Sequence, residues 1–264
     1  MYGFELHRPK SLNEAVTLLA KSDSRPLAGG QTLVAAMKLR LTASENLVDL
    51  GGIAELRGIR READTLVIGA MTKHAEVAES TEVRREIPAL ALLAGGIGDR
   101  QVRNMGTLGG SIANSDPAAC YPAAVLGLGA TIHTNTRKIA ADDFFKGLYE
   151  TALEENEIIT AVSFPIPKRA AYVKFRNAAS RFATAGVFVS QGANGVRLAV
   201  TGCASCVYRA TDMEKALSAN FSADAVKLIK VSPDGLNSDL HASAEYRAHL
   251  IPVLAGRAVA QALE

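Results

Sequence analysis

Short apolar runs alternate with segments of helical periodicity along the N-terminal half of the chain, and this alternation constrains the fold most. Residues 46–50 and 66–69 look like buried strands ended by turn residues. Helical spacing is found over residues 12–19, after a capping-box pattern at 11–14, and over residues 32–39. Strands and helices in alternation predict an α/β arrangement.

Later segments indicate a second, smaller domain. A strand over residues 158–164 is ended by Pro165 and Pro167, which mark our preferred boundary. A chain of 264 residues suits two domains. We therefore expect an N-terminal domain over 1–168, with subdomains of about 1–58 and 59–168, and a C-terminal domain over 169–264. The other expected elements are helices over 72–79 and 88–94, then strands over 172–176, 187–191 and 196–200, then helices over 209–217, 223–229 and 244–263, the last kinked at Pro252.

Glycine is dense between residues 95 and 129. Such a composition should weaken ordinary helices and strands, because glycine loses more backbone freedom on folding than other residues do. It also lets a backbone come close to a ligand or to another backbone. We expect this stretch to border a binding site.

Charge and composition exclude several classes of function. The 29 Lys and Arg residues balance 27 Asp and Glu residues, and the two signs are interspersed, so nucleic acid is not an expected partner. Residues 1–6 lack the layout of a secretory signal, and no uncharged apolar run reaches the roughly 18 residues that a spanning helix needs. We expect a cytoplasmic protein without an integral membrane segment.

Metal and catalytic signatures are weak or missing. Cys203 and Cys206 have the spacing of a redox or zinc pair, but no second pair exists, and two small buried residues at a strand end explain them better. The five histidines are scattered singly, and no phosphate-loop, zinc-protease or nucleophile-elbow motif is present. We expect no metal site and no catalytic side chain on this chain.

Two diglycines are the strongest candidates for a binding site. Gly29-Gly30 lies between an expected strand and an expected helix, so backbone amides at a helix N-terminus could hold a phosphate. Gly109-Gly110 repeats the theme, with Thr107, Ser111 and Asn114 around it. Two such cradles suit a diphosphate held mostly by backbone amides. Each diglycine taken alone is better explained as an ordinary turn, and the two together with their flanking residues favour the binding site.

The flanking residues resemble the flavoprotein subunit of the xanthine dehydrogenase and carbon monoxide dehydrogenase family. The resemblance rests on five segments in matching order, at residues 27–40, 68–72, 98–111, 114–119 and 172–185. It implies a two-subdomain FAD-binding region of the PCMH type, similar to vanillyl-alcohol oxidase, followed by a small α/β C-terminal flavoprotein domain.

The resemblance also implies which residues bind the cofactor. Residues 27–34 would wrap the FAD diphosphate, and residues 107–111 would make the second contact with the diphosphate and ribityl region. Ile97 would lie against the isoalloxazine, and Ile159, Lys174 and Phe182 near the ring and its entrance. The full set of expected cofactor-binding residues is Leu27, Ala28, Gly29, Gly30, Gln31, Thr32, Leu33, Val34, Ile97, Thr107, Leu108, Gly109, Gly110, Ser111, Asn114, Asp116, Cys120, Ile159, Lys174 and Phe182.

One residue departs from the family pattern. The family commonly has an aspartate four residues after its Asp-Pro pair, and this chain has Cys120 there. A polar contact to the cofactor should therefore be lost or be taken over by Asp116. An altered flavin environment is the expected consequence.

By resemblance, the chain is an oxidoreductase subunit that carries FAD in a molybdenum hydroxylase. Molybdopterin would lie on a large partner subunit and [2Fe-2S] clusters on a small one, in a dimer of heterotrimers. Electrons would pass from the clusters to the FAD and on to NAD, oxygen or another acceptor. The hydroxylated substrate stays open among aldehydes, purines, N-heteroaromatics and carbon monoxide, because its pocket would lie on another chain.

Two rival functions remain open from the sequence. The chain could be a free-standing FAD-dependent oxidase or reductase with its own substrate pocket. It could also be a non-catalytic module that binds a nucleotide through its diglycines. Purification separates the three, since each predicts a different combination of bound flavin, partner chains and activity.

Overall fold

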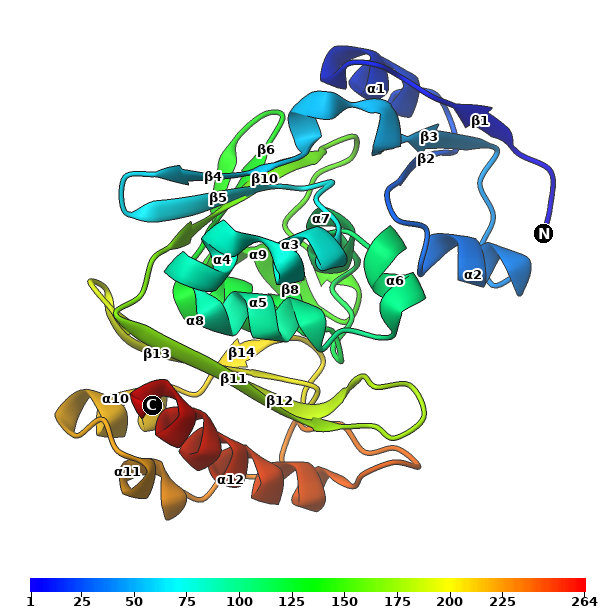
Figure 1. The fold of residues 1–264 in the computed structure, drawn as a ribbon. Coiled ribbons are helices and arrows are strands. Elements are labelled where there is room, and N and C mark those ends of the chain that lie inside the picture. Colours follow the sequence, from blue (N-terminus) through cyan, green and yellow to red (C-terminus); the bar gives the residue numbers. More distant parts are fainter.

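The computed structural model describes residues 1–264 as three layers that follow the order of the chain (Figure 1). The first layer is a parallel sheet of order β1-β3-β2 with one helix, α1, before β2 and another, α2, after it. Its elements are β1 (Glu5–His7), α1 (Leu12–Leu19), β2 (Ser24–Leu27), α2 (Leu33–Lys38) and β3 (Asn46–Asp49), followed by the 3-10 turns Leu50–Gly52 and Ala54–Leu56.

Local sequence signals account for this first layer. Helix α1 has the expected bounds, and the Ser11 side chain accepts a hydrogen bond from the backbone N–H of Glu14 at 3.3 Å. The Glu14 carboxylate accepts from the backbone N–H of Lys10 rather than from that of Ser11. Pro26 lies in β2, an edge strand, where its missing N–H leaves no gap in the ladder.

The second layer is a five-stranded antiparallel sheet of order β4-β5-β10-β6-β7 with a group of helices below it in Figure 1. Together they enclose the largest hydrophobic core, of 31 buried residues. The strands are β4 (Ile59–Glu62), β5 (Thr65–Gly69), β6 (Thr131–Thr134), β7 (Lys138–Ala140) and β10 (Ile159–Pro165). The helices are α3 (His74–Glu79), α4 (Thr81–Glu86), α5 (Pro88–Gly95), α6 (Arg100–Met105), α7 (Leu108–Asn114), α8 (Tyr121–Leu128) and α9 (Ala141–Phe144), and a small hairpin joins β8 (Phe145–Gly147) to β9 (Glu150–Thr151).

The glycine-rich stretch is helical, contrary to the expectation that its glycines would weaken regular structure. It contains α6, α7 and α8, and every residue of α8 is buried. Gly127 shows why glycine is needed there, since a Cβ at this position would lie 2.7 Å from Cδ1 of Phe188. Tertiary packing of a helix that is apolar on all sides has overridden weak intrinsic propensity.

The third layer is an antiparallel sheet of order β11-β12-β13-β14 that lies between two groups of helices. Helix α12 packs on one face, and α5 and α8 pack on the other (Figure 1). The elements are β11 (Arg169–Arg176), β12 (Ala183–Gly192), β13 (Gly195–Thr201), β14 (Tyr208–Arg209), α10 (Thr211–Ala219), α11 (Ala223–Lys227) and α12 (Ala244–Leu263). Helix α12 has the expected bounds and continues through Pro252.

These three layers confirm the expected α/β arrangement, and the second and third share the large core. None of the helices combines the length and the apolarity that crossing a membrane requires.

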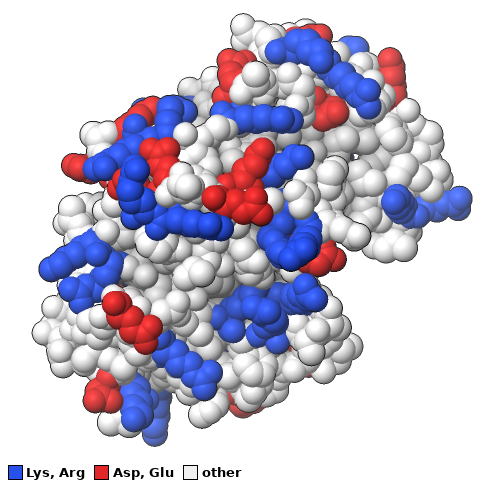
Figure 2. All heavy atoms as spheres, viewed as in Figure 1, with Lys and Arg blue, Asp and Glu red and all other residues white.

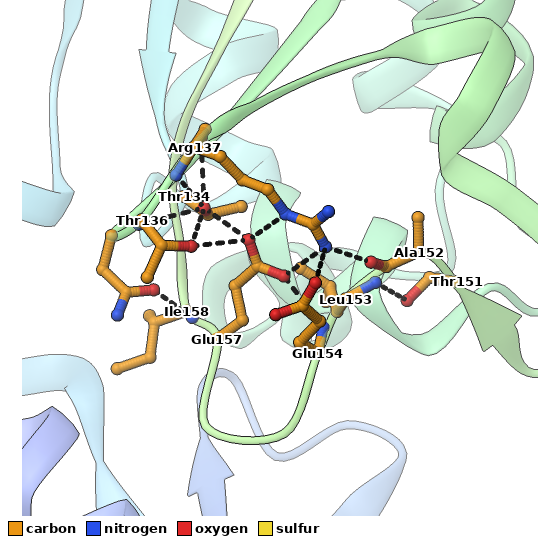
Figure 3. A network of polar contacts seen from close by, with 10 residues as sticks. Thr134, Thr136, Arg137, Thr151, Ala152, Leu153, Glu154, Glu157 and Ile158 are labelled. Carbon is orange, nitrogen blue, oxygen red and sulfur yellow. Dashed lines mark hydrogen bonds and ion pairs between the residues drawn. The ribbon is translucent and has the colours of Figure 1, made fainter.

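A buried carboxylate ties the β6–β7 turn to the loop before β10 (Figure 3). The Glu157 side chain is 2% exposed and accepts five hydrogen bonds, two of them from Arg137 at 2.9 Å each. The other donors are the hydroxyls of Thr134 and Thr136 and the backbone N–H of Glu154. The hydrogen bonds from Arg137 lower the pKa of Glu157 to about 2.

Glu157→Gln should therefore lower the melting temperature at pH 7 by about 4 °C, because the isosteric amide loses the charge-assisted bonds. A carboxyl group whose pKa is lower in the folded than in the unfolded state stabilises the folded state at pH values above its unfolded-state pKa. That pKa is 4.5 for this group. The difference in melting temperature between parent and variant should disappear as pH falls from about 4.5 toward 2. Glu154→Gln is the matched control, since the exposed Glu154 also pairs with Arg137, at 3.3 Å. Equal losses in the two variants, by thermal denaturation, would contradict this account.

Candidate functional site

The first diglycine forms the expected turn between a strand and a helix. Leu27 ends β2, and α2 begins at Leu33 after an N-cap at Thr32. Gly30 has φ of 69°, a left-handed conformation that favours glycine. The turn therefore has two residues without a Cβ atom shortly before the start of α2.

The second diglycine lies inside a helix and does not repeat the turn between a strand and a helix. Gly109 and Gly110 belong to the first turn of α7, whose N-cap Thr107 accepts a hydrogen bond from the backbone N–H of Gly110 at 3.2 Å. Gly109 faces the protein interior, because a Cβ there would lie 2.6 Å from Cβ of Ala70. The two diglycines are thus different structures, one a turn and the other the start of a helix.

The structure brings the two diglycine segments together. A Cβ on Gly29 would lie 2.2 Å from the carbonyl oxygen of Met105 and 2.7 Å from Cα of Gly106. A Cβ on Gly110 would lie 3.3 Å from Cβ of Ala28. The first turn therefore packs backbone against backbone on the segment that leads into α7. Glycine at position 29 is required by this close approach.

A cavity of about 400 Å³ opens between the first layer, α7 and the third layer. Its size falls in the range of ligand-binding cavities. Most expected cofactor-binding residues line it, namely Leu27, Ala28, Gly29, Gly30, Gln31, Thr32, Leu33, Ile97, Thr107, Gly110, Ser111, Asn114, Asp116, Cys120, Lys174 and Phe182.

Four expected residues do not line the cavity. Leu108 and Gly109 are buried on the inner side of α7, and Val34 packs behind Gly30, whose Cβ would lie 3.0 Å from Cγ2 of Val34. Ile159 is 6% exposed and belongs to the large core through β10. A contact of these residues with a ligand stays a prediction.

Cys120 lies at the cavity wall beside a lysine. Its Sγ is 3.3 Å from Nζ of Lys174, which also donates to the carbonyl oxygens of Gly96 and Arg181 at 2.9 Å each. Asp116 lines the same cavity and accepts a hydrogen bond from the backbone N–H of Ala118 at 2.8 Å. A carboxylate at position 120 would have paired with Lys174, so the cysteine leaves this ammonium without an acidic partner.

His74 lines the cavity but carries no sequence signal of its own. Its ring is 5% exposed and lies against Gly106, where a Cβ would come within 2.5 Å of Nε2. Burial, and then the charge of Arg103, lower the pKa of His74 to about 4, so the ring is neutral at physiological pH. Nδ1 is buried without a hydrogen-bond partner in the protein. Gly106 is the sequence feature that makes room for this ring.

Other lining residues that sequence reasoning missed lie within or beside the matching segments but were not singled out there. They are Pro26, Gly98, Val102, Gly106, Ala113, Ala119, Ser180 and Arg181. The last two come from the β11–β12 connection, and the resemblance covered that connection without singling either of them out.

The cysteine pair lies away from the cavity. Cys203 is fully buried in the core of the third layer, where burial raises the pKa of its thiol to about 12. Cys206 is half-buried, and both thiols are free. A protonated, buried thiol is a poor metal ligand and a poor nucleophile.

The cavity fits a diphosphate-containing cofactor. Three of the four diglycine residues line it without a side chain, and His74 in the same lining has a buried Nδ1 that no protein group satisfies. Thr32, Thr107 and Ser111 add hydroxyl-bearing residues to the lining, and Ile97 and Phe182 add apolar side chains. Backbone amides and hydroxyls can hold a phosphate group, and the apolar side chains can contact a planar ring.

Comparison with known proteins points to one family. Residues 2–167 match the family described as FAD binding domain in molybdopterin dehydrogenase. The chain is similar to the carbon monoxide dehydrogenase medium chain of Hydrogenophaga pseudoflava, at 37% identity over 98% of this chain and 96% of the relative. It is similar to the glyceraldehyde dehydrogenase medium chain of Sulfolobus acidocaldarius, at 34% identity over 97% and 96%. Quinoline 2-oxidoreductase from Pseudomonas putida 86 contains a chain that superposes with a TM-score of 0.88, at 30% identity over 98% of this chain and 96% of that one.

Proposed function

This chain belongs to the FAD-binding subunits of molybdopterin-dependent oxidoreductases, and from that membership we propose that it is the electron-transfer subunit of a heteromeric molybdenum hydroxylase. The observation that carries the proposal is the cavity bounded by two diglycine segments that meet at residues 105–106. The phrase "medium chain" in the names of two relatives supports a larger and a smaller partner. We propose a molybdopterin subunit and a [2Fe-2S] subunit in these places, in a dimer of heterotrimers.

The residues of this chain would bind and orient the cofactor. FAD would supply the redox chemistry, by accepting electrons from the iron–sulfur subunit and passing them to an acceptor. The turn at Gly29-Gly30 and the first turn of α7 would hold the diphosphate, with Thr32 and Ser111 as side-chain donors. Ile97 and Phe182 would flank the ring, and Lys174 would place a positive charge at its edge.

We further propose the division of the chain at residue 168. The strand β10 ends at Pro165 and β11 begins at Arg169, and the sheets on the two sides of this connection are separate. The C-terminal part, 169–264, would act as a cap that completes the cavity. It contributes Lys174, Ser180, Arg181 and Phe182 to the lining.

The substrate of the whole enzyme would be chosen by the molybdopterin subunit. The names of the three relatives above refer to carbon monoxide, glyceraldehyde and quinoline. Each relative nevertheless matches this chain over nearly its full length. A common flavin subunit with different substrates is expected when the hydroxylation pocket lies on another chain.

Purification under native conditions tests the proposal. We expect a yellow complex with flavin absorbance near 450 nm (an approximate value for oxidised flavins) and two further chains detected by mass spectrometry. A stable monomer that oxidises a substrate without molybdenum would support a free-standing flavoprotein instead. A colourless protein that FAD cannot reconstitute would support a nucleotide-binding module.

A further inference from the structure

Three basic side chains from different parts of the chain converge on one short loop. Nζ of Lys174, on β11, donates to the carbonyl oxygen of Gly96 at 2.9 Å. Nη1 of Arg103, on α6, donates to the carbonyl oxygens of Ile97 and Gly98 at 2.9 and 3.2 Å. Nη1 of Arg181, in the β11–β12 connection, donates to the same Gly98 oxygen at 3.4 Å. The loop between α5 and α6 therefore collects three positive charges.

None of these three charges is neutralised by an acid. Lys174, Arg103 and Arg181 take part in none of the ion pairs of the structure. Two acids lie near these cations, Asp99 next to Gly98 in the sequence and Asp116 in the cavity lining. Asp99 accepts a hydrogen bond from the backbone N–H of Val102 and Asp116 from that of Ala118, and neither pairs with one of the three cations. In Figure 2, blue side chains outweigh red ones between α6 and the strands β11 and β12. The three cations still outnumber these two carboxylates, so the local net charge is positive.

The cluster borders the mouth of the cavity. Lys174, Arg181, Ile97 and Gly98 line the cavity, and Phe182 beside them is 47% exposed. Arg181 is exposed, whereas Lys174 and Arg103 are half-buried. None of the three side chains donates a hydrogen bond to a residue of either diglycine segment. On the proposed function, on which this inference rests, the cluster surrounds the ring end, where electrons must leave.

We propose that Arg103, Lys174 and Arg181 form a cationic rim that binds the electron acceptor through a negatively charged group. The acceptor class is a small anionic oxidant, such as one carrying phosphate, carboxylate or sulfonate groups. Uncompensated cations at a cavity mouth raise the local concentration of anions and their encounter rate. The same charges would slow the approach of a cationic oxidant.

Two inorganic oxidants of opposite charge test the rim on the purified complex. The reduced flavin gives up two electrons and two protons, so two ferricyanide anions or two ferricenium cations each take one electron, and the protons go to solvent. For Arg181→Gln at low salt we expect ferricyanide to reoxidise the flavin about 3- to 10-fold more slowly and ferricenium to do so faster, by stopped-flow absorbance. Ferrocyanide, which binds without reacting, should bind the oxidised complex several-fold more weakly in a spectral titration.

A charge-preserving variant and added salt test whether the charge of Arg181 causes the change in rate. Arg181→Lys should keep both parent rates, and about 0.5 M salt, where the Debye length is about 4 Å, should erase the difference between parent and Arg181→Gln. Arg257→Gln removes an exposed arginine without an ion pair from α12 and should leave both rates unchanged.

The outcomes separate this proposal from the function on which it rests. Rates that fall for both oxidants, together with a lower flavin content, would place Arg181 in cofactor binding and overturn the rim. Rates that change for neither oxidant would also overturn it. A complex without flavin absorbance would instead refute the proposed function, before the rim is tested.

Discussion

Gly29→Ala should remove FAD from the protein. The new Cβ would lie 2.2 Å from the carbonyl oxygen of Met105 and 2.7 Å from Cα of Gly106, and both are backbone atoms that cannot rotate away. The first diglycine turn must then move off the segment that leads into α7, which separates the two halves of the diphosphate cradle. We expect FAD to bind about 100-fold more weakly, a loss of about 3 kcal/mol, so that the variant purifies almost colourless.

A distant glycine gives the matched control for this substitution. A Cβ on Gly256, in α12, would have its nearest neighbour, the carbonyl oxygen of Ala223, at 3.6 Å, an ordinary contact. Gly256→Ala should keep a full complement of FAD and gain slightly in stability, since alanine is the better helix former. The ratio of flavin absorbance to protein, with circular dichroism to verify folding, decides the matter. A folded Gly29→Ala protein with stoichiometric FAD would show that the turn does not hold the cofactor.

His74 should make the stability of the protein depend on pH between about 4 and 6.5. The unfolded chain takes up a proton on this ring as pH falls below 6.5, but the buried folded ring resists protonation until about pH 4. A base whose pKa is lowered in the folded state destabilises that state as pH falls. The loss of unfolding free energy is complete when pH reaches the folded-state pKa. The shift corresponds to about 3 kcal/mol of unfolding free energy.

His74→Gln isolates this contribution, because glutamine keeps a polar group and does not titrate. The variant should be less stable than the parent at pH 7, and the difference should shift by about 3 kcal/mol in its favour between pH 6.5 and 4. Urea unfolding followed by circular dichroism at a series of pH values measures it. His249→Gln, on the exposed side of α12, is the control whose profile should follow that of the parent. Parallel profiles for the parent and His74→Gln would rule out a buried, neutral histidine.

Much of the secondary structure could be predicted because its signals are local. The helix α1 begins after Ser11, whose side chain caps it, and both α1 and α12 have the predicted bounds. The prediction failed for the glycine-rich stretch, where α6, α7 and α8 form. Intrinsic propensity argues against those helices, and burial of all of α8 against β12 and β13 outweighs it.

The candidate site likewise contains residues that a local sequence pattern could predict and residues that it could not. Gly29 and Gly30 could be found in advance, because a turn between a strand and a helix leaves a pattern in adjacent residues. His74 could not, since it reaches the cavity from a segment without any motif, and Arg181 could not, since nothing within its segment distinguishes it from its neighbours. Gly109 was expected at the cavity because it adjoins Gly110, but one residue along a helix turns the backbone by about 100° and points it into the core.

The sequence by itself therefore determined the bounds of α1 and α12, the family resemblance and the two segments proposed to build the cradle, because these depend on residues that are neighbours along the chain. Only the tertiary structure decided that Gly29 packs on Gly106, that His74 is buried beneath it and that three basic residues share one loop. These contacts join residues far apart in the chain, and long-range packing, burial and electrostatics fix them rather than local backbone preference.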